Sequence, residues 1–355
     1  MTSITPACAS NPLPAWAIGP FRRPVDAQPV ITPDPAAQFH CPMRGRDIRW
    51  EALHTFNPAA VVRDGVIHLL YRAEDDTGAM KIGMHTSRLG LATSADGLSF
   101  KRRPSPVLFP AADDQRANEW DGGCEDPRLA ETEDGNFVLT YTQWNRRVPR
   151  LAVATSRDLI TWVKHGPAFA GTAYVDIASK SGAIVHRIAG GRLVAARIDG
   201  RYWMYWGEGT VFAAHSTDLL RWIPVADVAG VLTPLLPPRP GHFDSGLAEG
   251  GPQAVLTDAG IVLLYNGKNA IGDDRDPQVA AGTYAGGQAL FAAHDPLRLL
   301  ARMDQPFVRP ERAWEASGQY AAGTTFIEGL VLHNGKWLLY YGCADSFVGV
   351  VVAER

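Results

Sequence analysis

A strand signature that recurs along the chain constrains the fold more than any other feature of the sequence. Each copy is a run of apolar and aromatic residues that ends in tyrosine. Five copies are present: Leu69-Leu70-Tyr71, Val138-Leu139-Thr140-Tyr141, Tyr202-Trp203-Met204-Tyr205, Val262-Leu263-Leu264-Tyr265 and Leu338-Leu339-Tyr340-Tyr341. Recurring units of this kind are typical of repeat architectures. We therefore expect the chain to consist of repeated β-strand units.

A second signature, a serine and aspartate turn followed by an aromatic residue, comes after three of these strands. The copies are Ala92 to Phe100, Ala154 to Trp162 and Ala214 to Trp222, with a degenerate fourth at Ala292 to Leu297. Serine and aspartate side chains bond nearby backbone amides in tight turns, and the aromatic residue can anchor the next strand. Further turns are expected at Asp64-Gly65, Asp134-Gly135, Asp199-Gly200 and Asn334-Gly335.

These patterns, with almost no helical periodicity, predict the all-β class and a five-bladed β-propeller. An elongated pair of β-sandwiches is the alternative, but it does not account for five copies of one signature. We expect residues 1–355 to form one domain, with an irregular, proline-rich segment over 1–40 that wraps around it.

Composition narrows the classes of function. The formal net charge of −3 argues against a nucleic acid or an anionic membrane as partner, and no run approaches the length of a membrane span. The four cysteines at 8, 41, 124 and 343 show neither zinc-ligand spacing nor a disulfide framework. We expect free thiols, no metal, no cofactor and a cytoplasmic location; the sequence leaves a homo-oligomer open.

Polar residues recur beside the strands that would line the axis of a propeller. The candidates for a binding pocket there are Asn57, Arg72, Glu125, Asp126, Lys180, Glu208, Asp244, Glu249, Asn266 and Asp345. Carboxylates interleaved with aromatic and amide side chains suit a sugar, because rings cover its apolar face and acids bond its hydroxyls. Glycoside cleavage also needs one protonated carboxyl and a second carboxylate.

We single out Asp126, Glu208 and Glu249 as the catalytic candidates. Each also has a purely structural interpretation: Asp126 or Glu125 could pair with Arg128, Glu208 could belong to a hairpin turn, and Glu249 could be a solvated loop charge. Their joint placement after inner strands favours function.

Taken together, these residues resemble glycoside hydrolase family 130, five-bladed propellers that act on β-mannosides. The resemblance spans nearly the whole chain and is carried by Gly123-Cys124-Glu125-Asp126-Pro127-Arg128 and Tyr340-Tyr341-Gly342-Cys343-Ala344-Asp345. It implies that Asp126 is the general acid of an inverting reaction, and that Asn57, Arg72 and Asp345 hold the mannose. Asp126 must then be protonated when substrate binds, so we expect burial or Glu125 to raise its pKa.

The family contains phosphorylases, which use phosphate, and hydrolases, which use water. The stretch from Gly200 to Glu208 lacks the His-Arg pair that the resemblance associates with phosphate, while Arg150 and Lys180 remain at or near phosphate positions. Glu208 and Glu249 look like the pair that activates water in the β-1,2-mannosidases. We therefore predict an inverting exo-β-mannosidase for β-1,2 linkages, with a phosphorylase that makes mannose 1-phosphate as the alternative.

Two further classes of function stay open at this point. Other five-bladed propellers cleave arabinosides or fructosides with their own acids, and a propeller that binds sugars without cleaving them is the non-enzymatic alternative.

Overall fold

The computed structural model describes residues 12–355, and these are almost entirely β-structure. The helical elements among them are one turn of α-helix, α1 (Arg116–Glu119), and one of 3-10 helix, η1 (Ala313–Glu315). The predicted all-β class is confirmed.

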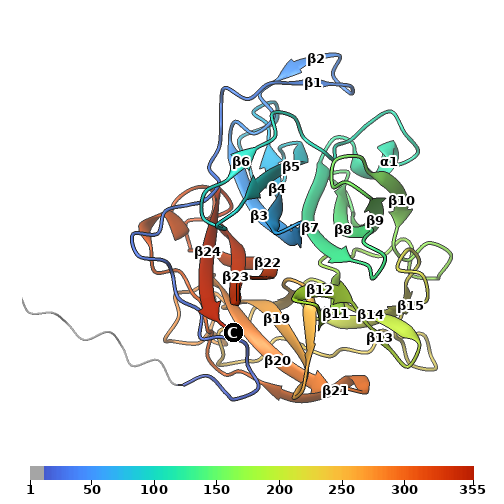
Figure 1. The fold of residues 1–355 in the computed structure, drawn as a ribbon, viewed down its shortest axis with the longest axis vertical. Helices are drawn as coiled ribbons and strands as arrows, with labels where there is room; N and C mark the ends of the chain where they lie inside the picture. The colour runs from blue at the N-terminus through green and yellow to red at the C-terminus, as the bar shows by residue number, and fades with distance from the viewer. Residues whose placement is uncertain (1–11) are drawn as a thin grey trace, which may run out of the picture.

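The strands form successive antiparallel groups that Figure 1 shows arranged in chain order around a common centre. A small hairpin precedes them, consisting of β1 (Phe39–Cys41) and β2 (Arg46–Ile48). The first group contains β3 (His54–Arg63), β4 (Val66–Glu74), β5 (Ser87–Ser94) and β6 (Lys101–Arg102). The second contains β7 (Gly123–Glu131), β8 (Phe137–Trp144), β9 (Pro149–Ser156) and β10 (Val163–Pro167).

The later groups follow the same plan. The third contains β11 (Ala183–Ala189), β12 (Arg192–Ala195), β13 (Arg197–Ile198), β14 (Arg201–Trp206), β15 (Phe212–Ser216) and β16 (Ile223–Pro224). The fourth contains β17 (Leu247–Gly250), β18 (Ala254–Thr257), β19 (Gly260–Lys268), β20 (Tyr284–Ala292) and β21 (Asp295–Arg302). The last contains β22 (Thr325–His333), β23 (Lys336–Cys343) and β24 (Phe347–Glu354).

Local sequence explains the tight connections within these groups. A two-residue type I′ turn needs positive φ at both central residues, which favours Asp-Gly and Asn-Gly. Both residues have positive φ in three of the predicted turns: Asp64-Gly65, Asp199-Gly200 and Asn334-Gly335. The hairpins β3–β4, β13–β14 and β22–β23 are therefore determined by local sequence.

The predicted serine and aspartate turns also form. In the turn after β9, Asp158 Oδ1 accepts hydrogen bonds from the backbone N–H groups of Ile160 and Thr161, and Ser156 Oγ accepts one from Leu159. Equivalent bonds recur in the turns that begin at Ser94 and Ser216. One turn chemistry thus repeats at the outer edge of three groups.

Bulges interrupt the first strands of several groups at corresponding places. The register shifts between Phe56 and Pro58 in β3, between Glu125 and Arg128 in β7, and between Ile327 and Gly329 in β22. A bulge leaves one residue unpaired and re-aims its side chain. These bulges leave Asn57, Asp126 and Glu328 outside the regular pairing of the strands. Asn57 and Asp126 have positive φ values of 45° and 47°.

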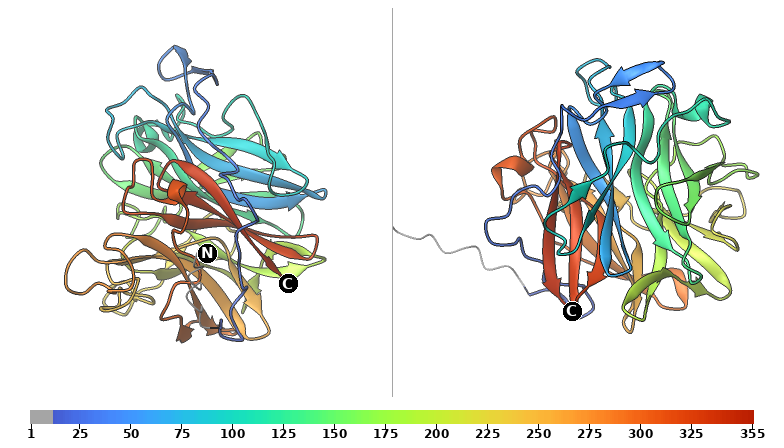
Figure 2. Two further views of the ribbon diagram at one scale, coloured as in Figure 1. Left: turned by 90° about the vertical axis from the view of Figure 1, so that its left-hand side faces the viewer. Right: turned by 45° about the horizontal axis from the view of Figure 1, so that its top comes forward.

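The N-terminal segment runs along the last strand, as Figure 2 shows. Arg22 bridges to Val352 and Ile31 to Val348, and Ile31 packs into an apolar cluster with Trp50, Tyr71 and β23 and β24. Within 12–38 the chain otherwise forms turns and irregular backbone; the rest of the predicted irregular segment, 1–11, lies outside the described residues.

None of the helices in residues 12–355 is both long enough and apolar enough to span a membrane.

Candidate active site

A cavity of about 320 Å³ opens where the strand groups converge. Its volume is in the range of small-molecule sites, and every group contributes to its wall. The lining residues are Phe56, Asn57, Arg72, Glu74, Ile82, Gly83, Glu125, Asp126, Trp144, Pro149, Lys180, Glu208, Glu249, Tyr284, Gln319, Tyr320, Thr324, Phe326 and Asp345.

Asp126 lies in this cavity on the bulge of β7 and is only 2% exposed. Its Oδ1 accepts hydrogen bonds from Asn57 Nδ2 at 2.8 Å and from Arg72 Nη1 at 3.0 Å, and Lys180 Nζ lies 3.4 Å from Oδ2. Burial alone would raise the pKa of this carboxyl, but the charges of Arg72, Lys180 and Arg128 together hold its pKa below the ordinary value. The expectation of a raised pKa at Asp126 is therefore wrong for the free protein.

The neighbouring Glu125 behaves in the opposite way. It is buried beside Asp126, with Arg72 Nη2 at 2.9 Å and a hydrogen bond of 3.2 Å from Ser87 Oγ. Burial raises the pKa of Glu125 to about 7, although Arg72 opposes the shift, and the charge of Asp126 adds to it. Of the two adjacent carboxyls, Glu125 is the one that holds a proton near neutral pH.

Lys180 connects Asp126 with the two other catalytic candidates. Its Nζ lies 3.8 Å from Glu208 Oε1 as well as 3.4 Å from Asp126 Oδ2, so these two oxygens are at most about 7 Å apart. Glu208 has a half-exposed side chain, whereas Glu249 on β17 is 1% exposed and accepts a hydrogen bond from Ser181 Oγ. Burial raises the pKa of Glu249 to about 7, with Lys180 opposing the shift and Glu208 adding to it.

Arg72 contacts several of the carboxyls that line the cavity. Besides Asp126 and Glu125 it donates to Glu74 Oε1 at 2.7 Å, and its guanidinium lies over the ring of Phe56. Asp345 lines the cavity as well; burial raises its pKa to about 6, against the charge of Arg72. Aromatic residues from three groups, namely Trp144, Tyr284 and Tyr320, also face the cavity, as a sugar pocket requires.

Three of the predicted binding residues do not line the cavity. Arg150 Nη2 bonds the exposed Asp176 at 3.2 Å. Asp244 is fully buried and accepts from Tyr265 Oη and Arg239 Nη2, with Arg302 Nη2 at 2.6 Å. Asn266 is also buried, and its side chain bonds the backbone N–H and C=O of Ile327, which ties β19 to β22. The sequence placed these polar residues correctly beside strands but did not show which way they point.

A family model described as beta-1,4-mannooligosaccharide phosphorylase, of glycoside hydrolase family 130, matches residues 34–355. The chain belongs to glycoside hydrolase family 130. A curated relative, the 1,2-beta-oligomannan phosphorylase of Thermoanaerobacter sp. (strain X514), is 30% identical over 309 residues, which cover 86% of this chain and 91% of the relative.

Two solved structures are more similar to this member of family 130. A glycosyl hydrolase from Bacteroides ovatus is 52% identical, with a TM-score of 0.95 over 97% of this chain and 96% of that one. The other comes from work on family 130 glycoside hydrolases that target β-1,2 mannosidic linkages in Candida mannan. It is 53% identical, with a TM-score of 0.95 over 97% of this chain and 98% of that one.

The two motifs that carry the resemblance to family 130 have a structural explanation. In the first, Gly123 lies against the backbone of Ser87, where a Cβ atom would come within 2.2 Å of the Ser87 carbonyl oxygen. In the second, a Cβ on Gly342 would lie 2.3 Å from Asn57 Oδ1. Both glycines allow neighbouring groups to approach closely at the cavity, and this packing holds Glu125, Asp126 and Asn57 in place.

The sequence reasoning did not select several lining residues as site residues. Glu74 ends β4 and Tyr284 begins β20, neither within a distinctive motif, and Gln319 and Tyr320 come from the loop before β22. Asn57 and Asp126 had a usable signal, because each precedes a proline inside an apolar strand and proline in a strand marks an edge or a bulge.

His54, Glu74 and His85 form a group in the described structure that could hold a metal ion, since their ligand atoms lie within 4.8 Å of one another. Sequence spacing did not reveal it. Glu74 already accepts from Arg72 Nη2 through Oε1 and from Gln319 Nε2 through Oε2, and His54 Nδ1 lies 3.0 Å from Ser346 Oγ. A cation there would have to compete with the guanidinium of Arg72.

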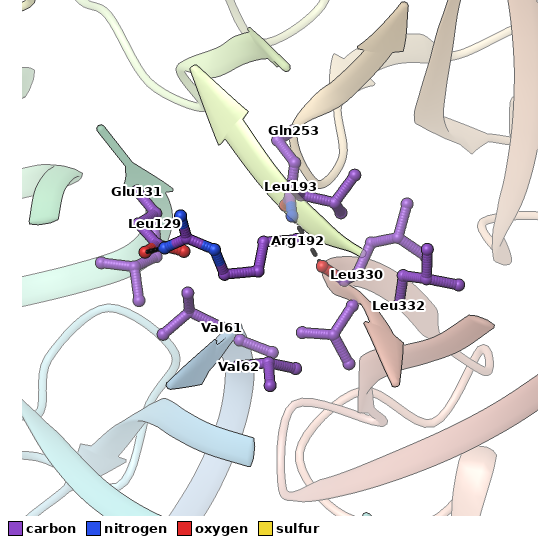
Figure 3. Close-up of a pocket in the computed structure, with 11 residues that line it drawn as sticks. Val61, Val62, Leu129, Glu131, Arg192, Leu193, Gln253, Leu330 and Leu332 are labelled. Atoms are coloured by element: carbon purple, nitrogen blue, oxygen red, sulfur yellow. Dashed lines mark hydrogen bonds and ion pairs between the residues drawn. The ribbon is translucent and has the colours of Figure 1, made fainter. Parts of the chain in front are cut away.

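A second, much smaller cavity of about 10 Å³ is drawn in Figure 3. Inner-strand residues such as Val61, Leu129 and Leu330 surround it, and the hairpin between β11 and β12 contributes Arg192 and Leu193. Arg192 pairs with Glu131 across it. The space holds no more than a water molecule, so it is not a second substrate site.

Proposed function

We propose that the chain is an inverting, exo-acting β-mannosidase that releases mannose from β-1,2-linked mannosides. Asp126 acts as the general acid in this proposal, and Glu249, with Glu208 beside it, activates water. Asn57, Arg72, Glu125, Lys180 and Asp345 hold the sugar.

The observation that carries the proposal is the charge of the cavity. Among the described residues that line it, the acids are Glu74, Glu125, Asp126, Glu208, Glu249 and Asp345, and the basic residues are Arg72 and Lys180. Both basic side chains are already paired with these carboxyls. A phosphate dianion would enter a site whose cations are occupied, whereas water would not meet this repulsion.

The reaction needs a proton at the glycosidic oxygen and a water molecule on the opposite face of the ring. In the free protein the proton of the Glu125 and Asp126 pair lies on Glu125, so substrate binding must move a proton onto Asp126. Water then attacks C1 while the bond from C1 to the leaving oxygen breaks. The leaving oxygen takes the proton of Asp126, and Glu249 accepts the proton of the water. Inverting enzymes keep their two carboxyl groups roughly 6.5 to 9.5 Å apart to admit this water.

Product analysis tests the proposal. The protein is incubated with β-1,2-mannobiose with and without phosphate, and mannose is separated from mannose 1-phosphate. Free mannose at equal rates in both reactions is the expected result. Mannose 1-phosphate that forms only with phosphate would overturn the hydrolase proposal.

A β-mannoside phosphorylase is the second candidate. Lys180 lines the cavity with a partly exposed side chain. Desolvation would lower its pKa, but the charges of Asp126, Glu208 and Glu249 raise it well above the ordinary value, so Lys180 stays cationic and could contact an anion. The 30% identical relative is named as a phosphorylase, and the family model bears a phosphorylase description. The 53% identical structure from work on family 130 hydrolases supports the first candidate.

We also propose that the five strand groups are the blades of one β-propeller and that residues 1–355 form one domain. Their chain-order arrangement around a common centre (Figure 1) and the contribution of every group to the wall of the cavity support this. The buried thiols of Cys41, Cys124 and Cys343 are unpaired, which is compatible with the predicted cytoplasmic location; Cys8 lies outside the described residues.

A further inference from the structure

Arg128 makes a set of contacts that the proposed reaction does not yet use. It lies two residues after Asp126 on β7 and is almost fully buried. Its Nη1 donates to the carbonyl oxygen of Asp126 at 3.1 Å, and its Nη2 donates to the carbonyl oxygen of Gly250 at 2.8 Å. Its Nε donates to the carbonyl oxygen of Gly251 at 3.1 Å. Gly250 directly follows Glu249, so one guanidinium holds the backbone of Asp126 and the backbone of the two residues after Glu249.

We propose that Arg128 is a positioning residue that fixes the separation between Asp126 and Glu249. The inference rests on the proposed function, in which these two carboxyls are the acid and the base. The guanidinium is planar and rigid, so its donors have fixed spacing and direction. Catalytic groups must be held within about 0.5 Å of the productive geometry, and two carboxyls on separate strand groups need a direct link to meet that limit.

Glu328 is a buried carboxyl residue that also contacts Arg128. It is the residue that the bulge of β22 leaves outside the regular pairing, it is fully buried, and its Oε1 lies 3.0 Å from Arg128 Nη1. Neither of its carboxylate oxygens accepts a hydrogen bond of good geometry. Burial raises the pKa of Glu328 well above the ordinary value, and the charge of Arg128 opposes this shift.

The charge of Arg128 acts on both Asp126 and Glu249. Arg128 lowers the pKa of Asp126 and opposes the burial that raises the pKa of Glu249. A substitution that keeps the charge but removes the planar fork therefore separates the geometric effect from the electrostatic one. Arg128→Lys is that substitution.

The test compares crystal structures and steady-state kinetics of the wild type and Arg128→Lys. We expect the separation of the Asp126 and Glu249 carboxyl carbons to change by more than about 0.5 Å and kcat to fall about 10- to 100-fold, with KM within about threefold. Arg128→Gln provides the same separation readout if the lysine variant does not fold, and the loss of charge should also raise the apparent pKa of the base. Arg192→Lys, which alters the Arg192 and Glu131 pair at the small cavity, is the matched control and should leave kcat unchanged.

An unchanged carboxyl separation, or a kcat within threefold of the wild type, overturns the inference. The separation is read without turnover, so it decides the positioning role even if the wild type makes mannose 1-phosphate. The products of the wild type decide the proposed function separately.

Discussion

At the scale of single residues, the carboxyls of the cavity differ in charge because their neighbours differ. Asp126 is ionised because Arg72 and Lys180 lie against its oxygens, whereas Glu125 and Glu249 have pKa values of about 7 because burial outweighs the nearby cations. Carboxyl groups with clearly different pKa values are typical of sites for acid and base catalysis. Each can therefore be tested by its own substitution.

Glu249→Gln should lower kcat about 10²- to 10⁴-fold, because the amide cannot accept the proton of the attacking water. Binding of mannose, measured by calorimetry, should change little, since the substitution keeps the size of the side chain. Glu208→Gln is the comparison. Full activity in the Glu249 variant together with an inactive Glu208 variant would transfer the role of base to Glu208.

The pH dependence of kcat/KM of the wild type should report the ionisation of Glu249. Glu249 must be ionised to act as a base, and its pKa is about 7 in the free protein. We expect kcat/KM on β-1,2-mannobiose to fall about tenfold per pH unit below pH 7, because kcat/KM follows the free enzyme. A profile that stays flat down to pH 5 would exclude Glu249 as the base.

At the scale of elements, the inner-strand bulges decide which side chains reach the cavity. Asn57 and Asp126 leave the strand ladder at these bulges, and Gly342 on β23 provides the space that Asn57 occupies. Without the extra residue of the bulge, the register would shift by one, and the side chains beyond it would point to the other face of the sheet.

Gly342→Ala tests this packing. Its Cβ would lie 2.3 Å from Asn57 Oδ1, so Asn57 must move away from Asp126. We expect stability to fall by roughly 1 to 3 kcal/mol, as overpacking usually costs, and kcat to fall at least tenfold. Gly272→Ala is the control, because nothing lies within 4 Å of its Cβ position. Thermal unfolding and kinetics of both variants measure the effects, and equal behaviour of the two would contradict the packing role.

The elements also show which features of the fold and of the site could be predicted from the sequence. The type I′ turns and the serine and aspartate turns were predictable because they depend on backbone preference and on bonds within four residues. Asp126, Glu208 and Glu249 could be selected because each lies at the end of a strand or at a break in it: Asp126 on the bulge of β7, Glu208 just after β14 and Glu249 near the end of β17. Asp244 and Asn266 do not line the cavity, because the direction of a polar side chain depends on partners such as Arg302 and Ile327, which are distant in sequence.

At the scale of the whole molecule, the buried carboxyls make stability depend on pH. Glu125 and Glu249 have pKa values of about 7 in the folded protein against about 4.5 when unfolded. The folded state then binds more protons between these values, so the free energy of unfolding should decrease as pH rises from about 4.5 to 7. Asp126 has the opposite sign, because its lowered pKa removes stability only under more acidic conditions.

Glu249→Gln should remove the contribution of Glu249 to the pH dependence of the free energy of unfolding. We expect its melting temperature to exceed that of the wild type at pH 8 and the difference to shrink at pH 5, with an effect of roughly 1 to 3 kcal/mol at most. Calorimetric melting at both pH values measures it. A difference that does not vary with pH would mean that Glu249 is ionised in the same range in both states.

The N-terminal segment has a consequence for synthesis and folding. Arg22 and Ile31 pair with β24, and Arg23 forms ion pairs with Glu311 and Glu315 nearly 300 positions away. Contacts between such distant parts of a chain form late, because a very long loop must close first. The last sheet therefore acquires its outer neighbour only after β24 itself has been synthesised. Until the N-terminal segment has paired with it, β24 exposes an unpaired edge that other chains could join.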